Sequence, residues 1–152
     1  MQLEIKSPAP HKDLVGVGGW LLFLCISLTI ASPLWQAHLA LKILPGLIST
    51  EHVDLNTLFR RVILFVTYCA LSGFSCAAGI MLWSENPKGP TVARAYLITS
   101  VVSVISIYSV CMLLGADLNL MKVAFQRLVY ACTWYSYLVA STRVRLTYAA
   151  LR

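Results

Sequence analysis

The sequence predicts an all-α polytopic membrane protein, a bundle of four transmembrane helices joined by short loops. Three observations lead to this prediction. Of the 152 residues, 59% are hydrophobic and only 12% are charged, whereas soluble domains have roughly 45–50% apolar and about 25% charged residues. Long uncharged segments recur along the chain, and charged residues, prolines and glycines gather between them. An apolar exterior of this kind is stable in lipid.

The predicted membrane domain covers residues 15–141, with spans at about 15–35, 60–83, 94–115 and 120–141. The second span is the clearest, because no residue from Val62 to Trp83 carries a formal charge. At about 1.5 Å per residue, a helix of this length crosses a hydrocarbon core of roughly 30 Å. The turn that follows, Ser84–Pro90, contains two prolines and a glycine that prevent the helix from continuing.

The first span begins with Gly16, Gly18, Gly19 and Trp20. Glycines permit a bent or closely packed backbone, and a tryptophan suits the interface between membrane and water. Pro33 is expected either to end this span or to kink it. A second apolar stretch, Trp35 to Ile48, is too short for a span of its own. The segment at 36–53 is therefore predicted to be an interfacial amphipathic segment or an extension of the first helix.

The fourth span contains two cations. Lys122 can extend its amine to the membrane surface, but Arg127 lies one to two turns further in. A cation at the centre of the bilayer costs about 2.5–3.5 kcal/mol on insertion scales. Arg127 therefore either reaches the interface or is buried against Asp117, a lipid phosphate or another subunit.

The charges at the ends of the spans predict the orientation of the chain. Residues 1–14 form a polar tail and residues 142–152 a basic tail. Seven cations fall on the side of the two tails and five on the other. Because Lys and Arg favour the cytoplasmic side, both termini are expected in the cytoplasm. The seven are Lys6, Lys12, Lys88, Arg94, Arg143, Arg145 and Arg152, and the five are Lys42, Arg60, Arg61, Lys122 and Arg127.

Small and hydroxyl side chains mark faces suited to helix packing. Gly73 and Ala77, like Ser75 and Gly79, are pairs of small residues four positions apart that let helix backbones approach closely. The third span carries hydroxyl groups at helical spacing, which can bond a neighbouring helix. A polar path for a small solute is the alternative interpretation of this stripe. Its members are Thr99, Ser103 and Ser106.

The sequence offers no recognisable catalytic machinery. The six acidic residues lie in tails and turns, the five cysteines lie in apolar segments without a CxxC pair, and the three histidines have no metal-ligand spacing. We therefore expect no catalytic residue, cofactor or metal site. No nucleic-acid-binding motif accompanies the net charge of +6, so the expected partners are the lipid bilayer and a membrane protein or a second copy.

Both ends of the chain resemble a known family. The opening Gly16–Leu21, followed by Ser32–Leu34, and the closing Tyr137–Tyr148 are similar to those of a bacterial inner-membrane family known as domain of unknown function 2569. The closing pattern is an aromatic residue, serine, Arg-Val and then threonine before an aromatic residue. The resemblance implies a small protein of the bacterial cytoplasmic membrane, and it implies no activity.

Three functions remain open from the sequence. The lack of chemical groups and the abundance of packing faces favour a non-enzymatic accessory subunit or assembly factor of a membrane complex. A small transporter or channel-like homo-oligomer would use the hydroxyl stripe. A lipid-binding or lipid-modifying protein would use residues at the cytoplasmic leaflet. The candidates for contact with lipid or a partner are Trp20, Arg94, Arg127, Arg143 and Arg145.

Overall fold

The computed structural model describes residues 17–48, 54–113 and 119–149, and these residues form helices without any strand. This confirms the prediction of an all-α protein. The elements are α1 (Trp20–Ile26), η2 (Ser27–Ala31), α2 (Ser32–Ile48), α3 (Leu55–Trp83), α4 (Gly89–Leu113), α5 (Asn119–Ala140) and α6 (Thr142–Ala149). Within the described ranges, three helical stretches are long and apolar enough to cross a membrane: Trp20–Ile48, Leu55–Trp83 and Gly89–Ile107. The prediction of a membrane protein is confirmed to this extent.

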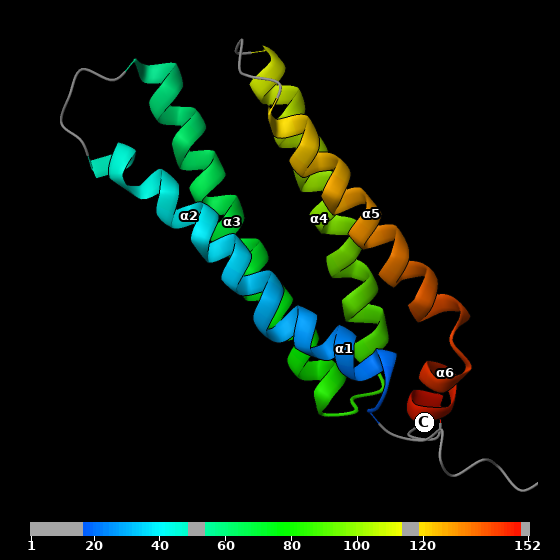
Figure 1. Cartoon of the computed structure of the whole chain (residues 1–152). Coiled ribbons are helices and arrows are strands. Elements are labelled where there is room, and N and C mark those ends of the chain that lie inside the picture. Colours follow the sequence, from blue (N-terminus) through cyan, green and yellow to red (C-terminus); the bar gives the residue numbers. More distant parts are fainter. Residues whose placement is uncertain (1–16, 49–53, 114–118, 150–152) are drawn as a thin grey trace, which may run out of the picture.

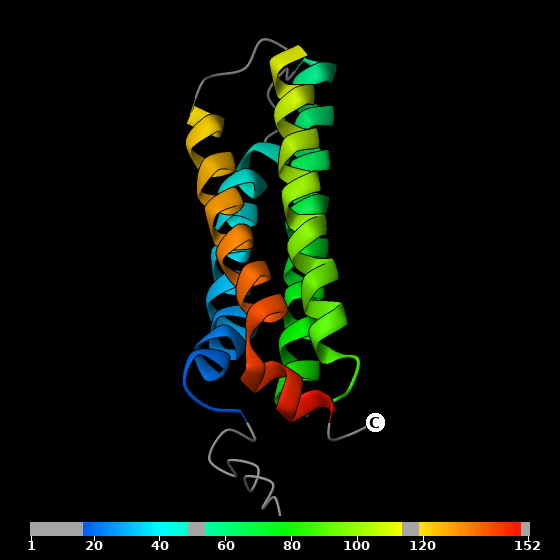
Figure 2. The ribbon, with the colours of Figure 1, turned by 90° about the vertical axis from the view of Figure 1, so that its right-hand side faces the viewer.

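The long helices pack in the order of the sequence, with α2 against α3, α3 against α4, and α4 against α5 (Figure 1). The described N-terminal end of the chain and α6 lie at the same end of the bundle (Figure 2). The α2/α3 and α4/α5 pairs diverge toward the opposite end (Figure 1). We call the two ends the α6 end and the open end.

The apolar core fills the half of the bundle nearer the α6 end. The first helix contributes residues from its beginning, whereas α3 and α5 contribute residues from their C-terminal halves and α4 from its first turns. Helix α6 covers this core at the α6 end with two buried side chains, Val144 and Tyr148. The other members include Leu21, Leu24, Leu28, Leu71, Ala78, Leu82, Tyr96, Leu97, Trp134 and Leu138.

Pro33 neither ends the first helix nor stands alone as a kink. It follows η2, a π-helical turn in which the Ser32 amide donates to the Ser27 carbonyl, five residues back. The next such bond would join residue 33 to the Leu28 carbonyl, but proline has no N–H. The Ser75 hydroxyl of α3 donates to the Leu28 carbonyl instead, at 2.8 Å. A neighbouring helix thus satisfies the carbonyl that the proline leaves without a backbone donor.

Gly79 lets α3 approach η2 closely enough for this bond. A Cβ atom at Gly79 would lie 3.0 Å from the Thr29 backbone nitrogen and would also overlap the Thr29 methyl group. Gly73 lies on the outer face of α3, where a Cβ would meet no other described atom within 4 Å. Of the two pairs of small residues, Ser75 and Gly79 therefore pack inside the chain, and Gly73 and Ala77 face outward.

The boundaries of the first and fourth spans differ in detail from the sequence-based ones. Helix α2 continues from Ser32 to Ile48, so the part of segment 36–53 that the structure describes extends the first helix. Helix α5 is not among the three described stretches that are long and apolar enough to cross a membrane, so the structure supports three of the four predicted spans. The basic tail forms α6 as far as Ala149. The N-terminal tail, residues 1–14, lies outside the described residues.

The contact at Gly79 can be tested with a matched pair of substitutions. We expect Gly79→Ala to lower the free energy of unfolding by about 1–3 kcal/mol, because the new methyl group forces α3 away from η2. Gly73→Ala adds the same atom to an open face and should leave stability unchanged or slightly raised. Thermal unfolding in detergent measures both. An equal loss in the two variants would contradict the close packing of α3 on η2.

Candidate functional site

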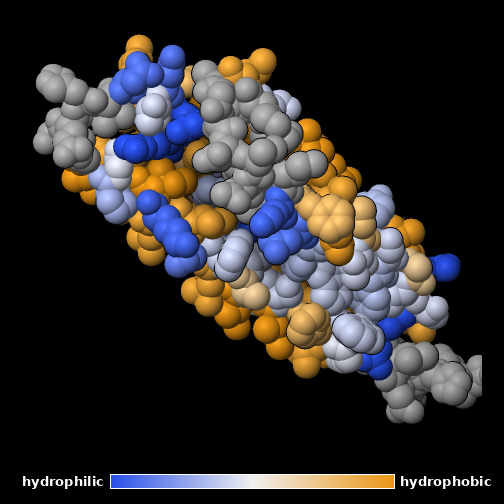
Figure 3. Space-filling view, turned by 45° about the horizontal axis from the view of Figure 1, so that its top comes forward, coloured by the Kyte–Doolittle hydropathy of each residue, from blue (hydrophilic) through white to orange (hydrophobic). Residues whose placement is uncertain are grey.

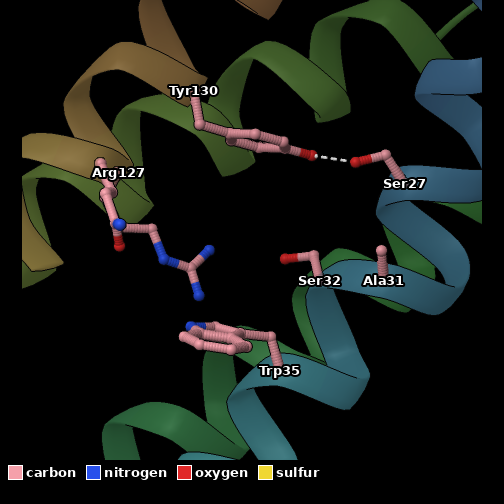
Figure 4. Close-up of a pocket in the computed structure, with 7 residues that line it drawn as sticks. Ser27, Ala31, Ser32, Trp35, Arg127 and Tyr130 are labelled. Atoms are coloured by element: carbon pink, nitrogen blue, oxygen red, sulfur yellow. Dashed lines mark hydrogen bonds between the residues drawn. The ribbon is translucent and has the colours of Figure 1, made fainter.

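A polar pocket lies part-way along the bundle between the first helix and α5 (Figure 4). Its volume is about 210 Å³. Its lining combines hydroxyl groups, a guanidinium, an amide and an indole with apolar atoms. The lining residues are Ser27, Ala31, Ser32, Trp35, Gln126, Arg127 and Tyr130. We call this the Arg127 pocket.

Hydrogen bonds between helices build one wall of the pocket. The Ser27 and Tyr130 hydroxyls lie 2.7 Å apart and join η2 to α5 (Figure 4). The Ser32 hydroxyl lies 2.6 Å from that of Tyr96 on α4. Gln36 is fully buried, and its Nε2 donates to the Ser32 and Tyr96 oxygens at 3.1 and 2.9 Å. These bonds fix η2 and the start of α2 against α4 and α5.

The Gln36 amide is only half satisfied. Its Oε1 is buried and accepts no hydrogen bond from any described residue. An unpaired buried acceptor is costly, particularly in an apolar environment. Gln36 was not among the site residues expected from the sequence, because it is uncharged and lies in the segment assigned to the membrane surface.

The Arg127 guanidinium points into the pocket, toward Trp35 and Ser32 (Figure 4). Arg127 lies about 12 Å from the start of α5 and about 20 Å from its end, at 1.5 Å per residue. No hydrogen bond or ion pair joins it to another described residue. Asp117, the partner considered from the sequence, lies outside the described residues. The pocket thus presents a cation and nearby hydroxyl groups to whatever enters it.

Aromatic side chains close the bundle between this pocket and the α6 end. The Trp134 ring lies 5.6 Å from that of Phe23 and 5.9 Å from that of Tyr137. Trp134 is buried, whereas Tyr135 on the next position is exposed. The Trp134 ring therefore joins α5 to α1, and the Tyr137 ring packs beside it on α5.

A second polar region lies at the α6 end, where α5 stops and α6 turns across the bundle. The Ser141 hydroxyl accepts the Val144 amide at 3.4 Å and so caps the start of α6. The break leaves the last carbonyls of α5 without helical donors. Arg94 of α4 donates its Nη2 to one of them, the Leu138 oxygen, at 2.7 Å, which also places a cation at the negative end of the helix dipole.

The glycine-rich beginning of the chain meets α6 at this end. A Cβ atom at Gly18 would lie 2.9 Å from Nη1 of Arg143, and one at Gly19 would lie 3.4 Å from it. Gly19 also has a φ of +57°, a conformation that favours glycine. The Arg143 side chain therefore occupies the space that side chains at these two positions would fill.

Tyr148 anchors the other side of α6. Its hydroxyl donates to the Leu82 carbonyl near the end of α3, at 2.7 Å. Burial raises the pKa of Tyr148 well above its ordinary value, so the phenol stays neutral and keeps its proton for this bond. Thr147 is buried beside it.

The remaining residues singled out from the sequence lie apart from the Arg127 pocket. Thr99 and Ser106 of α4 are exposed and Ser103 is half-buried, and none of them lines that pocket. Trp20 is 69% exposed at the α6 end, and Arg145 is exposed on α6. On the face shown in Figure 3, hydrophilic residues gather toward both ends and also stand part-way along, and hydrophobic residues cover the flanks. The described residues contain no group of three metal-ligating side chains.

A comparison with known protein families supports the resemblance seen at the two ends of the chain. The profile of a family described as "Protein of unknown function (DUF2569)" matches residues 14–149. The chain belongs to the DUF2569 family. This confirms the resemblance drawn from the opening and closing residues. No curated protein and no solved structure matches the chain.

The opening and closing patterns of this DUF2569 chain meet in the folded protein. Arg143 lies over Gly18 and Gly19, Ser141 caps α6, and Tyr148 fastens α6 to α3. Several of the residues that carried the resemblance therefore fold the C-terminal segment back against the start of the first helix. Ser32 of the opening pattern lies apart from these contacts and lines the Arg127 pocket.

The contact between the two ends predicts a stability difference between two arginines of α6. Arg143→Ala should lower the melting temperature in lipid-free detergent, because it removes the side chain that fills the space beside Gly18. Arg145→Ala, two residues along the same helix and exposed, is the control and should melt like the unsubstituted protein. Unchanged melting of the Arg143 variant would argue against this role.

Proposed function

We propose that this DUF2569 chain is a four-span protein of the bacterial inner membrane that serves as a non-enzymatic accessory subunit of a membrane complex. In this proposal both termini lie in the cytoplasm. The Arg127 pocket receives an acidic side chain from a transmembrane helix of the partner. The single observation that carries the proposal is the position of Arg127, a cation part-way along a membrane helix without an acceptor among the described residues.

The composition of α5 supports a fourth span. Its 22 residues measure about 33 Å along the helix axis, enough to cross the hydrocarbon core. Its low mean hydropathy comes in part from Gln126, Arg127 and Tyr130, which all line the pocket. Its exposed positions include large apolar side chains, among them Phe125, Val129 and Val139. A span that directs part of its polar side chains to a pocket and large apolar side chains outward is compatible with lipid.

The depth of Arg127 favours a partner helix over a lipid head group. With α5 spanning the membrane, Arg127 lies about 12 Å along the helix from its nearer end, a depth at which an Asp or Glu on a neighbouring helix is a more direct partner than a lipid phosphate. Ionisable residues in membranes usually pair with one another. The Ser27, Ser32 and Tyr130 hydroxyls add hydrogen-bonding partners beside the guanidinium.

The outer face of α3 offers a second surface for helix packing. Gly73 and Ala77 are exposed there, and small residues allow a close approach of another membrane helix. This face is separate from the pocket, so it supports the accessory role and does not define the acidic site.

The number of spans determines which sides of the membrane the termini occupy. We expect reporters fused to the N- and C-termini to give cytoplasmic signals in both cases, for example fluorescence of a green fluorescent protein and no activity of an exported phosphatase. Termini on opposite sides would mean that α5 does not cross the membrane. If both termini lay outside the cytoplasm, the orientation predicted from the Lys and Arg count would be reversed.

The partner is tested by purifying the tagged protein from its own membranes and identifying retained proteins by mass spectrometry. We expect a stoichiometric membrane protein with an acidic residue in a transmembrane helix. Arg127→Gln should reduce its recovery about tenfold or more, because breaking a buried ion pair costs several kcal/mol. Lys122→Gln is the matched control, since it removes the same charge from the exposed start of α5 and should retain the partner.

One outcome would overturn the accessory role, and another would overturn the Arg127 pocket as its binding site. One is a homo-oligomer or monomer without a protein partner in native membranes. The other is a partner retained equally by the Arg127 and Lys122 variants, which would move the interaction away from the pocket.

A further inference from the structure

A second cleft, independent of the proposed partner site, lies at the α6 end between the start of α4 and α6. Its volume is about 200 Å³. Arg94 contributes a guanidinium from α4 and Arg145 contributes one from α6. The other lining residues are Pro87, Pro90, Thr91, Val144 and Tyr148. Two cations from separate elements therefore line one cleft.

The walls of this cleft are fixed. Arg94 is held by its bond to the Leu138 carbonyl, and Tyr148 is held by its bond to the Leu82 carbonyl. Val144 and Pro90 are buried. The cleft thus has a rigid floor, and the exposed Arg145 and Thr91 side chains stand at its rim.

No described ion pair neutralises the two arginines of the cleft. Burial raises the pKa of the Tyr148 phenol, and Glu85 lies close enough to raise this pKa further. Neither Arg94 nor Arg145 forms an ion pair with a described acidic residue, and Glu85 is the only acidic residue described in the adjoining turn. The Nη2 of Arg94 is used on Leu138, and its Nε is buried with no described acceptor. Its Nη1 has no described hydrogen-bond acceptor either. Guanidinium groups pair strongly with phosphate oxygens.

The position of the cleft indicates which phosphate would reach it. Helix α3 ends at Trp83 and α4 begins at Gly89, so the cleft adjoins the ends of two apolar helices. The exposed Trp20 lies at the same end. Tryptophans and the ends of spans lie at the level of the lipid head groups, where an anionic phospholipid is the commonest source of phosphate.

We propose that the cleft between Arg94 and Arg145 binds the phosphate of an anionic phospholipid head group. Arg94 supplies the fixed cation at the floor, Arg145 closes over the phosphate from α6, and the Thr91 hydroxyl is a further donor at the rim. A lipid with net negative charge is preferred over a zwitterionic one, because the choline of the latter already compensates its own phosphate.

The test is a titration of the purified protein in a neutral detergent with phosphatidylglycerol and, separately, phosphatidylcholine. Native mass spectrometry counts the bound lipids. We expect tighter binding of phosphatidylglycerol and one site that Arg145→Gln weakens about fivefold, corresponding to the attraction of one surface cation. The Arg145 side chain makes no hydrogen bond or ion pair to another described residue, so this variant separates binding from folding.

Lys88→Gln is the matched control. Lys88 is exposed in the turn beside the cleft and does not line it, so the variant loses the same charge at the same end of the bundle. Binding by the Lys88 variant should change less than twofold, which is a small free-energy difference. If phosphatidylglycerol binding weakened equally in the Arg145 and Lys88 variants, general surface charge would explain the binding. The proposed site in the cleft would then be wrong.

Two further results would also overturn the proposal. In the first, inorganic phosphate competes with phosphatidylglycerol and stabilises the protein as much as the lipid does. The cleft would then be a site for a free anion. Unchanged binding by the Arg145 variant would remove the cleft from lipid recognition. Neither result bears on the Arg127 pocket, because the partner test uses a different residue and a different readout.

Discussion

The hydrogen bond from Ser75 to the Leu28 carbonyl links the first helix to the rest of the bundle. Pro33 withholds the amide that would otherwise pair with this carbonyl in the π-helical turn, and lipid offers no substitute donor. Gly79 brings α3 close enough for the Ser75 hydroxyl to take its place. The same turn contributes Ser27 and Ala31 to the Arg127 pocket, so the joint between α3 and η2 also positions one wall of the candidate site. π-Helical turns often occur at functional sites.

The bundle divides into a closed half and an open half, and the pocket lies near their boundary. The core residues, α6 and the aromatic contacts of Trp134 all belong to the α6 end. Toward the open end the α2/α3 and α4/α5 pairs separate (Figure 1). The polar bonds of Ser27 with Tyr130 and of Ser32 with Tyr96 lie where apolar packing gives way to this separation. Directional bonds hold the helices in register there.

The helices could be predicted from the length and charge of the apolar segments. The polar pairing between helices could not be predicted. The uncharged stretch before Trp83 and the proline-rich turn after it predicted α3 and its end. Arg127 stood out because a charge in an apolar segment is conspicuous. The π-helical turn could not be foreseen, since Pro33 is equally compatible with an end or a kink. Gln36 escaped notice for another reason: it is an ordinary residue alone, and only its hydrogen bond to Tyr96 of α4 makes it part of a buried pair.

The two partly buried arginines of α4 and α5 show how depth determines the need for a partner. Arg94 lies one to two turns from the end of the bundle and already donates to the Leu138 carbonyl. Its remaining charge lies near the level where water and head groups are available. Arg127 lies well along α5, with hydroxyl groups but no described carboxylate beside it. With α5 as the proposed fourth span, desolvation of a guanidinium is most costly at that depth. A chain that retains a cation there gains from an acidic counterpart, and a neighbouring membrane helix is the element that can bring one.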